Sequence, residues 1–217
     1  MSTKNCSYQE HTLKPFSDFK RLFDIASSLF LILISFPFFL SIACLIKLTS
    51  KGSVFYGGYR LGKNGELFCC WKFRTMYPDA EKKLEGYLDK SKELRNEWNQ
   101  YLKLKKDPRV TWIGRGLRKM SLDELPQLWN VLKGDLSLVG PRPYLVEEVQ
   151  SILGARAHKI LSVRPGITGL WQVSGRNNIP FSDRIRLDEE YVMKRSFYLD
   201  LVLLCKTIPT VIFAKGY

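Results

Sequence analysis

The sequence predicts an α-rich, mixed α/β fold: one compact domain with a few short strands, preceded by an apolar helix that enters a membrane. Three observations predict it. Residues 22–48 are almost wholly apolar, and two β-forming runs flank the turn sequence Lys63-Asn64-Gly65. Farther along, apolar residues recur at helical spacing between charged ones. No repeat or clear linker divides the 217 residues, so we expect a loose polar arm over residues 1–16, the membrane segment over residues 17–50 and the main domain over residues 51–217.

The apolar stretch is long enough to cross a bilayer, for which about 20 residues suffice. Pro37 lies in its middle, where it removes a backbone donor and predicts a kink. Positive charge favours the cytoplasmic side, and basic residues lie on both flanks: Lys14, Lys20, Arg21, Lys47 and Lys51. A helix that dips in, bends at Pro37 and returns satisfies both observations. An ordinary transmembrane helix with a tolerated proline is the alternative, and the residues alone leave both open. Asp24 is costly in lipid and is expected at the interface beside Lys20 or Arg21.

Beyond the membrane segment, the predicted elements begin with a β-hairpin whose strands cover residues 53–59 and 67–73. Residues 79–106 are expected to form one long helix, because leucine and aromatic residues fall on one stripe with charged residues opposite. This helix packs either on the core or on the membrane surface. Residues 183–195 predict another helix, charged on one side.

A second apolar stripe spans residues 122–132, with Gly134 as its C-cap. Pro126 disfavours the α region at Leu125, so this helix either begins near Pro126 or kinks there. The tail, residues 197–213, is apolar almost all round. Its internal charges and its proline favour an amphipathic helix embedded at the membrane interface.

The formal charge of +13 fits three kinds of partner: nucleic acid, an anionic membrane or phosphorylated substrates. The five cysteines form no CxxC pair, which favours free thiols in a reducing compartment. The chain has two histidines, so a zinc site is not expected. Any metal should be a hard, oxygen-liking ion such as Mg²⁺.

The most informative stretch is residues 121–128, Ser-Leu-Asp-Glu-Leu-Pro-Gln-Leu, which contains the acidic pair Asp123 and Glu124. Ser-x-x-Glu is also a helix capping box, and most such sequences are only caps. The alternative is chemical, because backbone N–H groups at a helix start favour a bound phosphate. An ionised Asp123 suits nucleophilic attack on phosphorus or Mg²⁺ binding, and Glu124 would share the metal or handle protons.

Cations and glycine turns accompany this pair in the sequence. Arg142 stands between two prolines, which restrict its backbone and aim a guanidinium that can bind phosphate bidentately. Each motif alone is weak, since glycine-rich turns and surface salt bridges are common. Together they predict an anionic substrate. The candidate phosphate and substrate ligands are Lys72, Arg74, Arg118, Arg142, Arg164, Gln172, Arg176 and Asn177.

Six ordered features resemble the bacterial sugar transferases, which are monotopic phosphoglycosyl transferases. They are the apolar segment broken by Pro37 and residues 20–24, 72–76, 121–130, 132–143 and 164–177. The resemblance runs from residue 17 to the C-terminus. It implies transfer of a hexose-1-phosphate from a UDP-sugar to undecaprenyl phosphate, with release of UMP. This is the first membrane step of exopolysaccharide, capsule or O-antigen synthesis. Residues 169–177 resemble the branch that uses UDP-glucose or UDP-galactose.

The resemblance also implies roles for the acidic pair in residues 51–217, which would be the catalytic domain. Asp123 would be the nucleophile and form a covalent aspartyl-phosphosugar, which the lipid phosphate then attacks. Glu124 would handle protons, and both carboxylates would bind Mg²⁺, with Mn²⁺ as a substitute.

The family's re-entrant helix keeps both ends in the cytoplasm. The resemblance therefore implies that the protein lies on the cytoplasmic face of the bacterial inner membrane and contacts its lipids. It implies no nucleic acid partner, and it is compatible with a homodimer. One departure concerns the bend. The family often has Ser immediately before the helix-breaking Pro, whereas here Phe36 precedes Pro37 and Ser35 stands one position further back. We expect Ser35 and Pro37 to form the bend with a different hydroxyl arrangement.

Two other functional classes compete with this one. A basic, membrane-anchored protein that binds nucleic acid or anionic lipid without catalysis would explain the charge and the anchor, but not the acidic pair among the cations. A scaffold or receptor with a membrane-crossing helix would place the N-terminal arm outside the cell.

Overall fold

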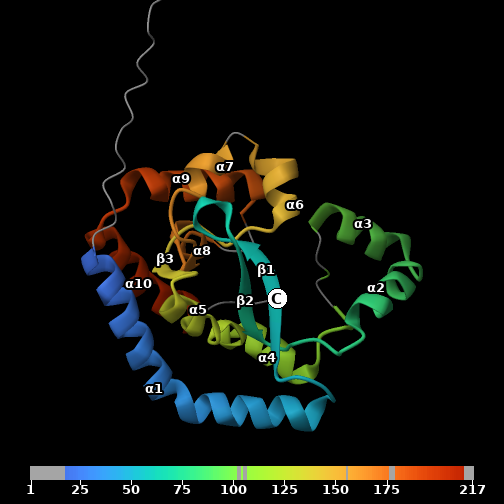
Figure 1. The fold of residues 1–217 in the computed structure, drawn as a ribbon. Coiled ribbons are helices and arrows are strands. Elements are labelled where there is room, and N and C mark those ends of the chain that lie inside the picture. Colours follow the sequence, from blue (N-terminus) through green and yellow to red (C-terminus); the bar gives the residue numbers. More distant parts are fainter. Residues whose placement is uncertain (1–17, 102–103, 105–106, 155, 176–178, 213–217) are drawn as a thin grey trace, which may run out of the picture.

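The structure is a computed structural model that describes residues 18–101, 104, 107–154, 156–175 and 179–212. It is helix-rich, with short strands and one long apolar helix at its start (Figure 1). The first half contains α1 (Asp18–Thr49), β1 (Phe55–Leu61), β2 (Leu67–Phe73), α2 (Ala80–Leu88), α3 (Lys92–Tyr101), α4 (Trp112–Lys119) and a 3₁₀ turn (Leu122–Glu124). The second half contains α5 (Gln127–Lys133), β3 (Ser137–Val139), α6 (Val146–Glu148), a π-helical turn (Val149–Leu153), α7 (Arg156–Ile160), β4 (Gly166–Thr168), α8 (Leu170–Val173), α9 (Phe181–Lys194) and α10 (Phe197–Ile212). The predicted arm, residues 1–16, lies outside the described residues.

The β1–β2 hairpin confirms the first predicted element. Its strands are antiparallel, and its register runs from Phe55 opposite Phe73 to Leu61 opposite Leu67. Asn64 in the turn has a φ of 58°, a left-handed conformation that asparagine tolerates. A second pair, β3 with β4, is parallel and was not predicted. Each of these strands has three residues, which is too short to produce a periodic signal.

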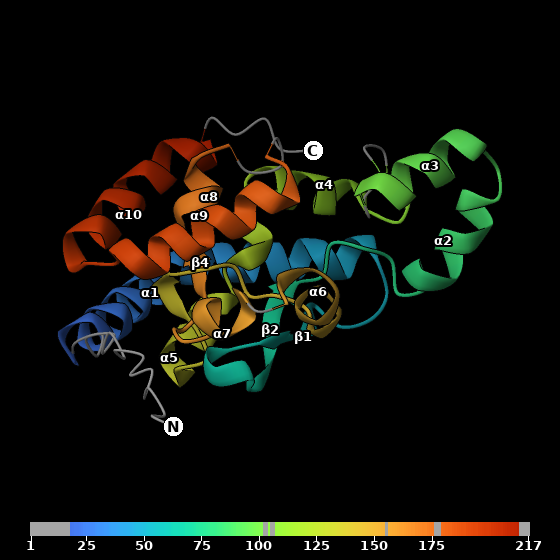
Figure 2. The same ribbon diagram turned by 90° about the horizontal axis from the view of Figure 1, so that it is seen from above.

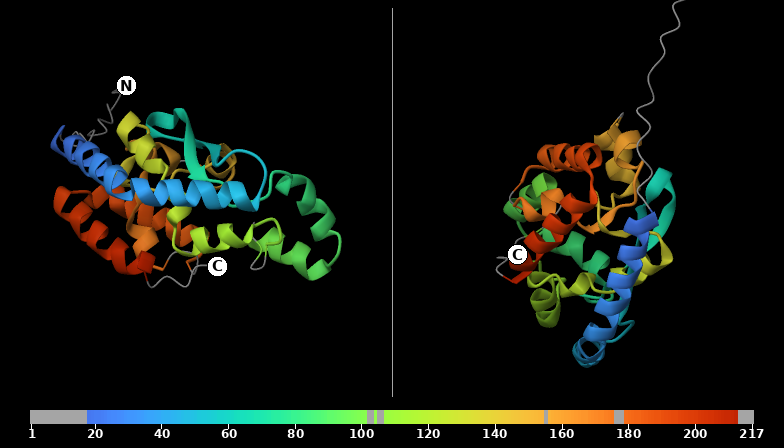
Figure 3. Two further views of the ribbon diagram at one scale, coloured as in Figure 1. Left: turned by 90° about the horizontal axis from the view of Figure 1, so that it is seen from below. Right: turned by 90° about the vertical axis from the view of Figure 1, so that its left-hand side faces the viewer.

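Helix α1 bends without breaking. Figure 1 and the right-hand view of Figure 3 show that it changes direction partway along its length. Pro37 cannot donate to the carbonyl one turn earlier, and its ring crowds that carbonyl. The Ser35 hydroxyl donates to the Leu31 carbonyl at 2.5 Å, an added side-chain bond that also bends helices. The predicted break at Ser35 and Pro37 is therefore a bend within a continuous 32-residue helix.

Both ends of α1 pack on the same protein body. Lys20, Asp24 and Ser28, spaced one turn apart, are the buried residues of its first half, and Ile42 and Ile46 are those of its second half. Between them, residues 29–41 contain no buried side chain. The apolar middle of the helix is therefore the part that the protein leaves uncovered.

The first half of α1 docks through a buried ionic network. Lys20 Nζ lies 2.9 Å from an Asp24 carboxylate oxygen and 3.0 Å from one of Asp200 in α10. The Ser137 hydroxyl in β3 donates to Asp24 at 2.8 Å, and the Tyr191 hydroxyl in α9 donates to Asp200 at 2.8 Å. Asp24 lies beside Lys20 as expected, and at 2% exposed it is buried among protein groups. Its predicted position at the membrane interface stays a prediction. Four elements meet at this network.

The main core involves some of the same elements as this network. Its buried side chains come from β2, α5, β3, α9, α10 and the loops beside β3 and β4, and they include Val131, Val139, Val192 and Leu203. The short helix α8 packs against both α9 and α10, and Figure 2 shows the three helices on one side of the molecule. Helices α2 and α3 project at the far end from α10 (Figure 2).

Two predicted helices differ from the structure. The long helix over residues 79–106 is instead α2 and α3, because the Ser91 hydroxyl accepts from the backbone N–H groups of Glu93 and Leu94 and starts a new helix. Helix α5 follows Pro126 and ends at Gly134, whose φ of 98° confirms the predicted C-cap. Leu125 nevertheless adopts the α region before Pro126, so its predicted exclusion from that region is wrong. Helices α9 and α10 confirm that residues 183–194 and 197–212 are helical. The embedding of α10 at a membrane interface stays a prediction.

We predict that Asp24→Ala strongly destabilises the fold. The change removes the carboxylate that accepts from the Ser137 hydroxyl and from the Leu138 N–H, and with it one of the two carboxylates that pair with Lys20. Breaking a buried ion pair from one side costs about 3–5 kcal/mol. Thermal unfolding of the detergent-solubilised protein measures the effect. Asp18→Ala is the matched control, because Asp18 is exposed in the first turn of the same helix and should cost at most about 1 kcal/mol. Equal melting temperatures for the two variants would mean that the network does not stabilise the fold.

Candidate active site

Asp123 and Glu124 lie in the 3₁₀ turn between α4 and α5. Ser121 opens this turn with a φ of 54° and makes no side-chain cap, so the capping-box interpretation of Ser121 and Glu124 is wrong. Asp123 is 8% exposed, whereas Glu124 is half-buried. Burial raises the pKa of Asp123 above its usual value against the opposing charges of Lys72 and Arg118, and the charge of Glu124 adds to the rise. The turn thus holds one sheltered carboxylate and one more accessible carboxylate side by side.

Lys72 in β2 faces both carboxylates. Its Nζ lies 2.5 Å from a Glu124 carboxylate oxygen. Burial works to lower the pKa of Lys72, but the charges of Glu124 and Asp123 outweigh it, so the pKa lies above its usual value. Lys72 therefore stays cationic and counters the cost of ionising Asp123. The structure brings this predicted site residue to the acidic pair.

Asn130 in α5 fixes the distance between β2 and the acidic turn. Its side-chain oxygen accepts from the Trp71 N–H at 3.0 Å, and its amide nitrogen donates to the Cys69 carbonyl at 2.8 Å. These bonds hold the backbone on the N-terminal side of Lys72. The sequence prediction missed Asn130, although a polar side chain within the apolar stripe of residues 122–132 is a signal that could have found it.

Arg118 in α4 is the second cation beside Asp123. Its Nε donates to the Thr75 hydroxyl at 2.9 Å. Burial lowers the pKa of Arg118, and the nearby charge of Asp123 opposes that shift. Thr111 caps α4 by accepting from the Gly114 N–H at 2.9 Å. A Cβ at Gly114 would lie 2.1 Å from the Thr75 carbonyl oxygen, so only glycine lets α4 approach this closely.

Arg74 and Arg164 bind helix ends instead of facing the acidic pair. The Arg74 guanidinium donates to the carbonyls of Ser50 and Lys51, just after the end of α1. Arg164 Nε donates to the Gly134 carbonyl at the end of α5. Both arginines complement the negative end of a helix dipole. Substrate binding by either one stays a prediction that these contacts do not favour.

Arg142 lies in a separate cluster with Trp171. The guanidinium groups of Arg142 and Arg184 lie 5.9 Å and 5.1 Å from the centre of the Trp171 ring. The Tyr144 hydroxyl donates to Asp188 at 2.6 Å, and the Arg142 N–H donates to the same carboxylate oxygen at 3.3 Å. Burial raises the pKa of Asp188 to about 7. The sequence prediction included Arg142 but missed Arg184 and Asp188, which look like ordinary members of a charged helix.

Of the three remaining predicted ligands, Gln172 lies within the described residues of the structure. Gln172 is half-buried in α8, and its side-chain oxygen is buried with no hydrogen-bond partner among the described residues. Such an atom normally finds a partner, so a ligand or water would complete it. Arg176 and Asn177 lie outside the described residues.

Within the described residues, no group of three or more His, Cys, Asp or Glu side chains is placed to hold a metal ion. Asp123 and Glu124 offer two adjacent carboxylates. Mg²⁺ commonly takes one or two carboxylates from the protein and completes its shell with water and substrate phosphates. The donor set therefore fits Mg²⁺ bound together with a phosphorylated substrate.

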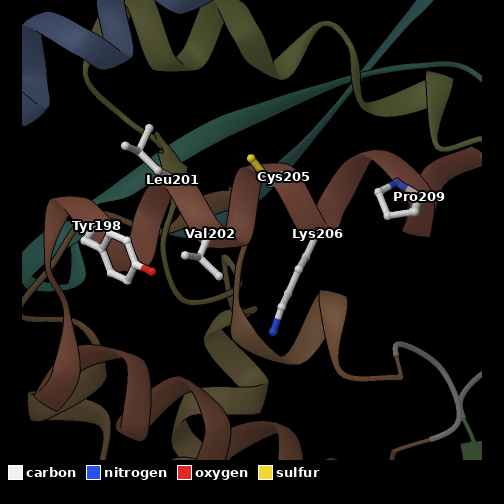
Figure 4. Close-up of a pocket in the computed structure, with 6 residues that line it drawn as sticks. All are labelled: Tyr198, Leu201, Val202, Cys205, Lys206 and Pro209. Carbon is white, nitrogen blue, oxygen red and sulfur yellow. The ribbon is translucent and has the colours of Figure 1, made fainter.

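Several elements of the described structure expose apolar surface. Helix α1 is long and apolar enough to cross a membrane, and 11% of its most apolar window is buried. Trp112 at the start of α4 is 60% exposed. A shallow apolar groove runs along α10, lined by Tyr198, Leu201, Val202, Cys205, Lys206 and Pro209 (Figure 4). Every lining residue belongs to α10, so the groove is a feature of that helix's outer surface rather than part of the carboxylate site.

The chain is similar to known sugar transferases. Residues 16–214 match the family described as "Bacterial sugar transferase". The exopolysaccharide production protein ExoY of Rhizobium meliloti is 45% identical over 197 residues, which cover 91% of this chain and 87% of the relative. The undecaprenyl-phosphate galactose phosphotransferase of Salmonella typhimurium is 43% identical over 91% of this chain and 41% of its own length. The undecaprenyl-phosphate glucose phosphotransferase of Komagataeibacter xylinus is 38% identical over 91% of this chain and 36% of its own length.

Proposed function

Because the chain belongs to the bacterial sugar transferase family, we propose that it is an undecaprenyl-phosphate sugar phosphotransferase of exopolysaccharide synthesis. It takes a hexose-1-phosphate from a UDP-sugar and releases UMP. The names of the relatives support the acceptor and the reaction class. Within the structure, the observation that carries the proposal is the acidic pair, Asp123 and Glu124, held against the cations Lys72 and Arg118.

The reaction has two displacements at one phosphorus. The Asp123 carboxylate attacks the sugar-bearing phosphorus of the UDP-sugar, and the bond to UMP breaks. An oxygen of undecaprenyl phosphate then attacks the same phosphorus and releases Asp123, which leaves the sugar on a lipid diphosphate. Lys72 and Arg118 favour the ionised nucleophile and offset charge on the transferred phosphoryl group. Glu124, more exposed than Asp123, is the group available for proton handling.

We propose glucose or galactose as the transferred sugar, and the names of two relatives carry these alternatives. Mg²⁺ would be held by Asp123 and Glu124, and it would neutralise the diphosphate of the donor. The metal assignment and the nucleophile assignment depend on the same acidic pair, whereas the choice of sugar depends on the names of the relatives.

We also propose that the enzyme sits on the cytoplasmic face of the inner membrane with α1 as a re-entrant helix. A helix of 32 residues is about 48 Å long, which would cross a bilayer if it were straight. Both ends of α1 pack on one protein body, and its uncovered middle is apolar. This arrangement supports entry and return on one side, because a crossing helix would separate its two docked ends.

We predict that Asp123→Asn abolishes turnover, because an amide cannot form the acyl phosphate. The rate of UMP release should fall about a thousand-fold or more with each member of a UDP-sugar panel in the presence of undecaprenyl phosphate. Asp79→Asn, the same chemical change at an exposed position, serves as the matched control and should keep full activity. Wild-type protein that releases no UMP from any donor would leave the non-catalytic binding protein as the better interpretation. Near-normal activity of a folded Asp123→Asn protein would sink the nucleophile assignment alone.

We predict that activity requires Mg²⁺. EDTA should abolish UMP release, and added Mg²⁺ or Mn²⁺ should restore it, because two carboxylates and a diphosphate form a hard oxygen site. A zinc-selective chelator should have no effect. Full activity after EDTA treatment and dialysis would contradict the metal assignment.

We predict that the N-terminal arm shares the cytoplasmic side with the active site. Cys6 in the arm reports its side, provided that the exposed Cys44 and Cys205 and the other two cysteines are replaced by serine. An impermeant thiol reagent should label Cys6 only after the cells are permeabilised. Pro37→Leu should straighten α1 and increase labelling in intact cells. Ready labelling of Cys6 in intact cells without the Pro37 change would mean that α1 crosses the bilayer.

A further inference from the structure

We propose that Thr75 is a positioning residue: its hydroxyl holds the Arg118 guanidinium in the orientation that serves Asp123 and the phosphoryl group of the donor. The inference rests on the proposed function. Thr75 follows β2 and is 6% exposed, so it is not placed to touch substrate itself. Its effect on the reaction would pass through Arg118.

The Thr75 hydroxyl bonds to Nε of Arg118, so the two terminal nitrogens of the guanidinium remain available to bind a phosphate. Arg118 Nε donates to Thr75 Oγ1 at 2.9 Å. Among the described residues, neither terminal nitrogen of Arg118 makes a hydrogen bond. A guanidinium bonded through Nε presents its two terminal nitrogens as a fork, the geometry that binds phosphate bidentately.

The charged groups around Arg118 favour more than one orientation of its guanidinium, so a hydrogen bond is needed to select one. Asp123 and Asp107 both attract it, while Arg109 repels it. Asp107 is already engaged, because Arg109 donates to both of its carboxylate oxygens at 2.6–3.1 Å. Arg109 in turn lies 5.1 Å from the Trp98 ring. The Asp107–Arg109 pair leaves the Thr75 hydroxyl as the hydrogen-bond acceptor of Arg118 in the described structure.

The main chain and the side chain of Thr75 have separable tasks. Its carbonyl oxygen accepts from the Thr111 N–H at 3.0 Å and from the Thr111 hydroxyl at 3.3 Å, which joins β2 to α4. A substitution at position 75 keeps that carbonyl. Its hydroxyl bonds to Arg118, so Thr75→Val removes the orienting bond and keeps both the shape of the side chain and the backbone contacts.

The test is a double-mutant cycle on UMP release. We expect Thr75→Val to lower kcat about 10-fold or more, because a hydrogen bond to a charged group is lost, with the smaller part of the effect in KM. Thr75→Ser, which keeps the hydroxyl, should recover most of the rate. In an Arg118→Ala background, Thr75→Val should cause no further loss, because the group that it positions is gone.

A packing role predicts different results. Thr111→Val removes the α4 cap and is the comparator: it should lower the melting temperature, and its effect on rate should multiply with that of Arg118→Ala. Wild-type rates in Thr75→Val, or a loss that multiplies with that of Arg118→Ala, would overturn the positioning role while the proposed function stands. If Thr75→Val does not fold, the same double-mutant cycle with Arg118→Ala is measured with Thr75→Ala, and Thr75→Ser again serves as the variant that keeps the hydroxyl. Failure of the unmodified enzyme to release UMP would instead count against the proposed function.

Discussion

The buried ionic network around Lys20, Asp24 and Asp200 is the constraint on which the rest of the structure depends. It ties α1 to β3, α9 and α10 with charged groups that lie away from water. Charges in that environment are tolerated only when they are paired and hydrogen-bonded, so the network permits few alternative arrangements of these four elements. The second half of α1 docks by different means, through Ile42 and Ile46 against a core cluster that contains Phe73 at the end of β2. The strand that carries Lys72 thus packs on α1, and the two docked ends of α1 leave its apolar middle uncovered by the described protein residues.

The chemistry of the site follows from a balance between burial and charge. Burial favours the neutral form of Asp123, whereas the nucleophile role that we propose for it requires the ionised form. The charges of Lys72 and Arg118 oppose the rise that burial causes in the pKa of Asp123, and each cation is placed by a contact away from the carboxylate. Asn130 holds the backbone beside Lys72, and Thr75 bonds the guanidinium of Arg118. The reactive turn therefore needs β2, α4 and α5 in fixed register, which explains why its partners are scattered along the sequence.

Two groups of cations in the described residues look alike in sequence but differ in what they bind. Arg21, Arg74 and Arg164 donate to backbone carbonyls at or just beyond the ends of helices. Lys72 and Arg118 instead face the acidic pair. The formal charge of +13 consequently overstates the positive field available to a substrate, because part of it holds the fold together. Arg142 belongs to neither group: it shares Trp171 with Arg184 and lies 3.8 Å from Glu148.

The sequence by itself determined the local features of this protein. It predicted the hairpin, α9, α10, the cap at Gly134, the bend near Pro37 and the acidic pair, because each depends on residues within a turn or two of one another. It could not separate α2 from α3 or find β3 and β4, since Ser91 acts through its own backbone contacts and three-residue strands carry no period. Only the tertiary structure decided which cations face Asp123, that Asp24 is buried, and that Asn130 and Thr75 support the site. Those outcomes depend on contacts between residues that lie 36 to 114 positions apart, and no local pattern encodes which distant partner a polar side chain will meet.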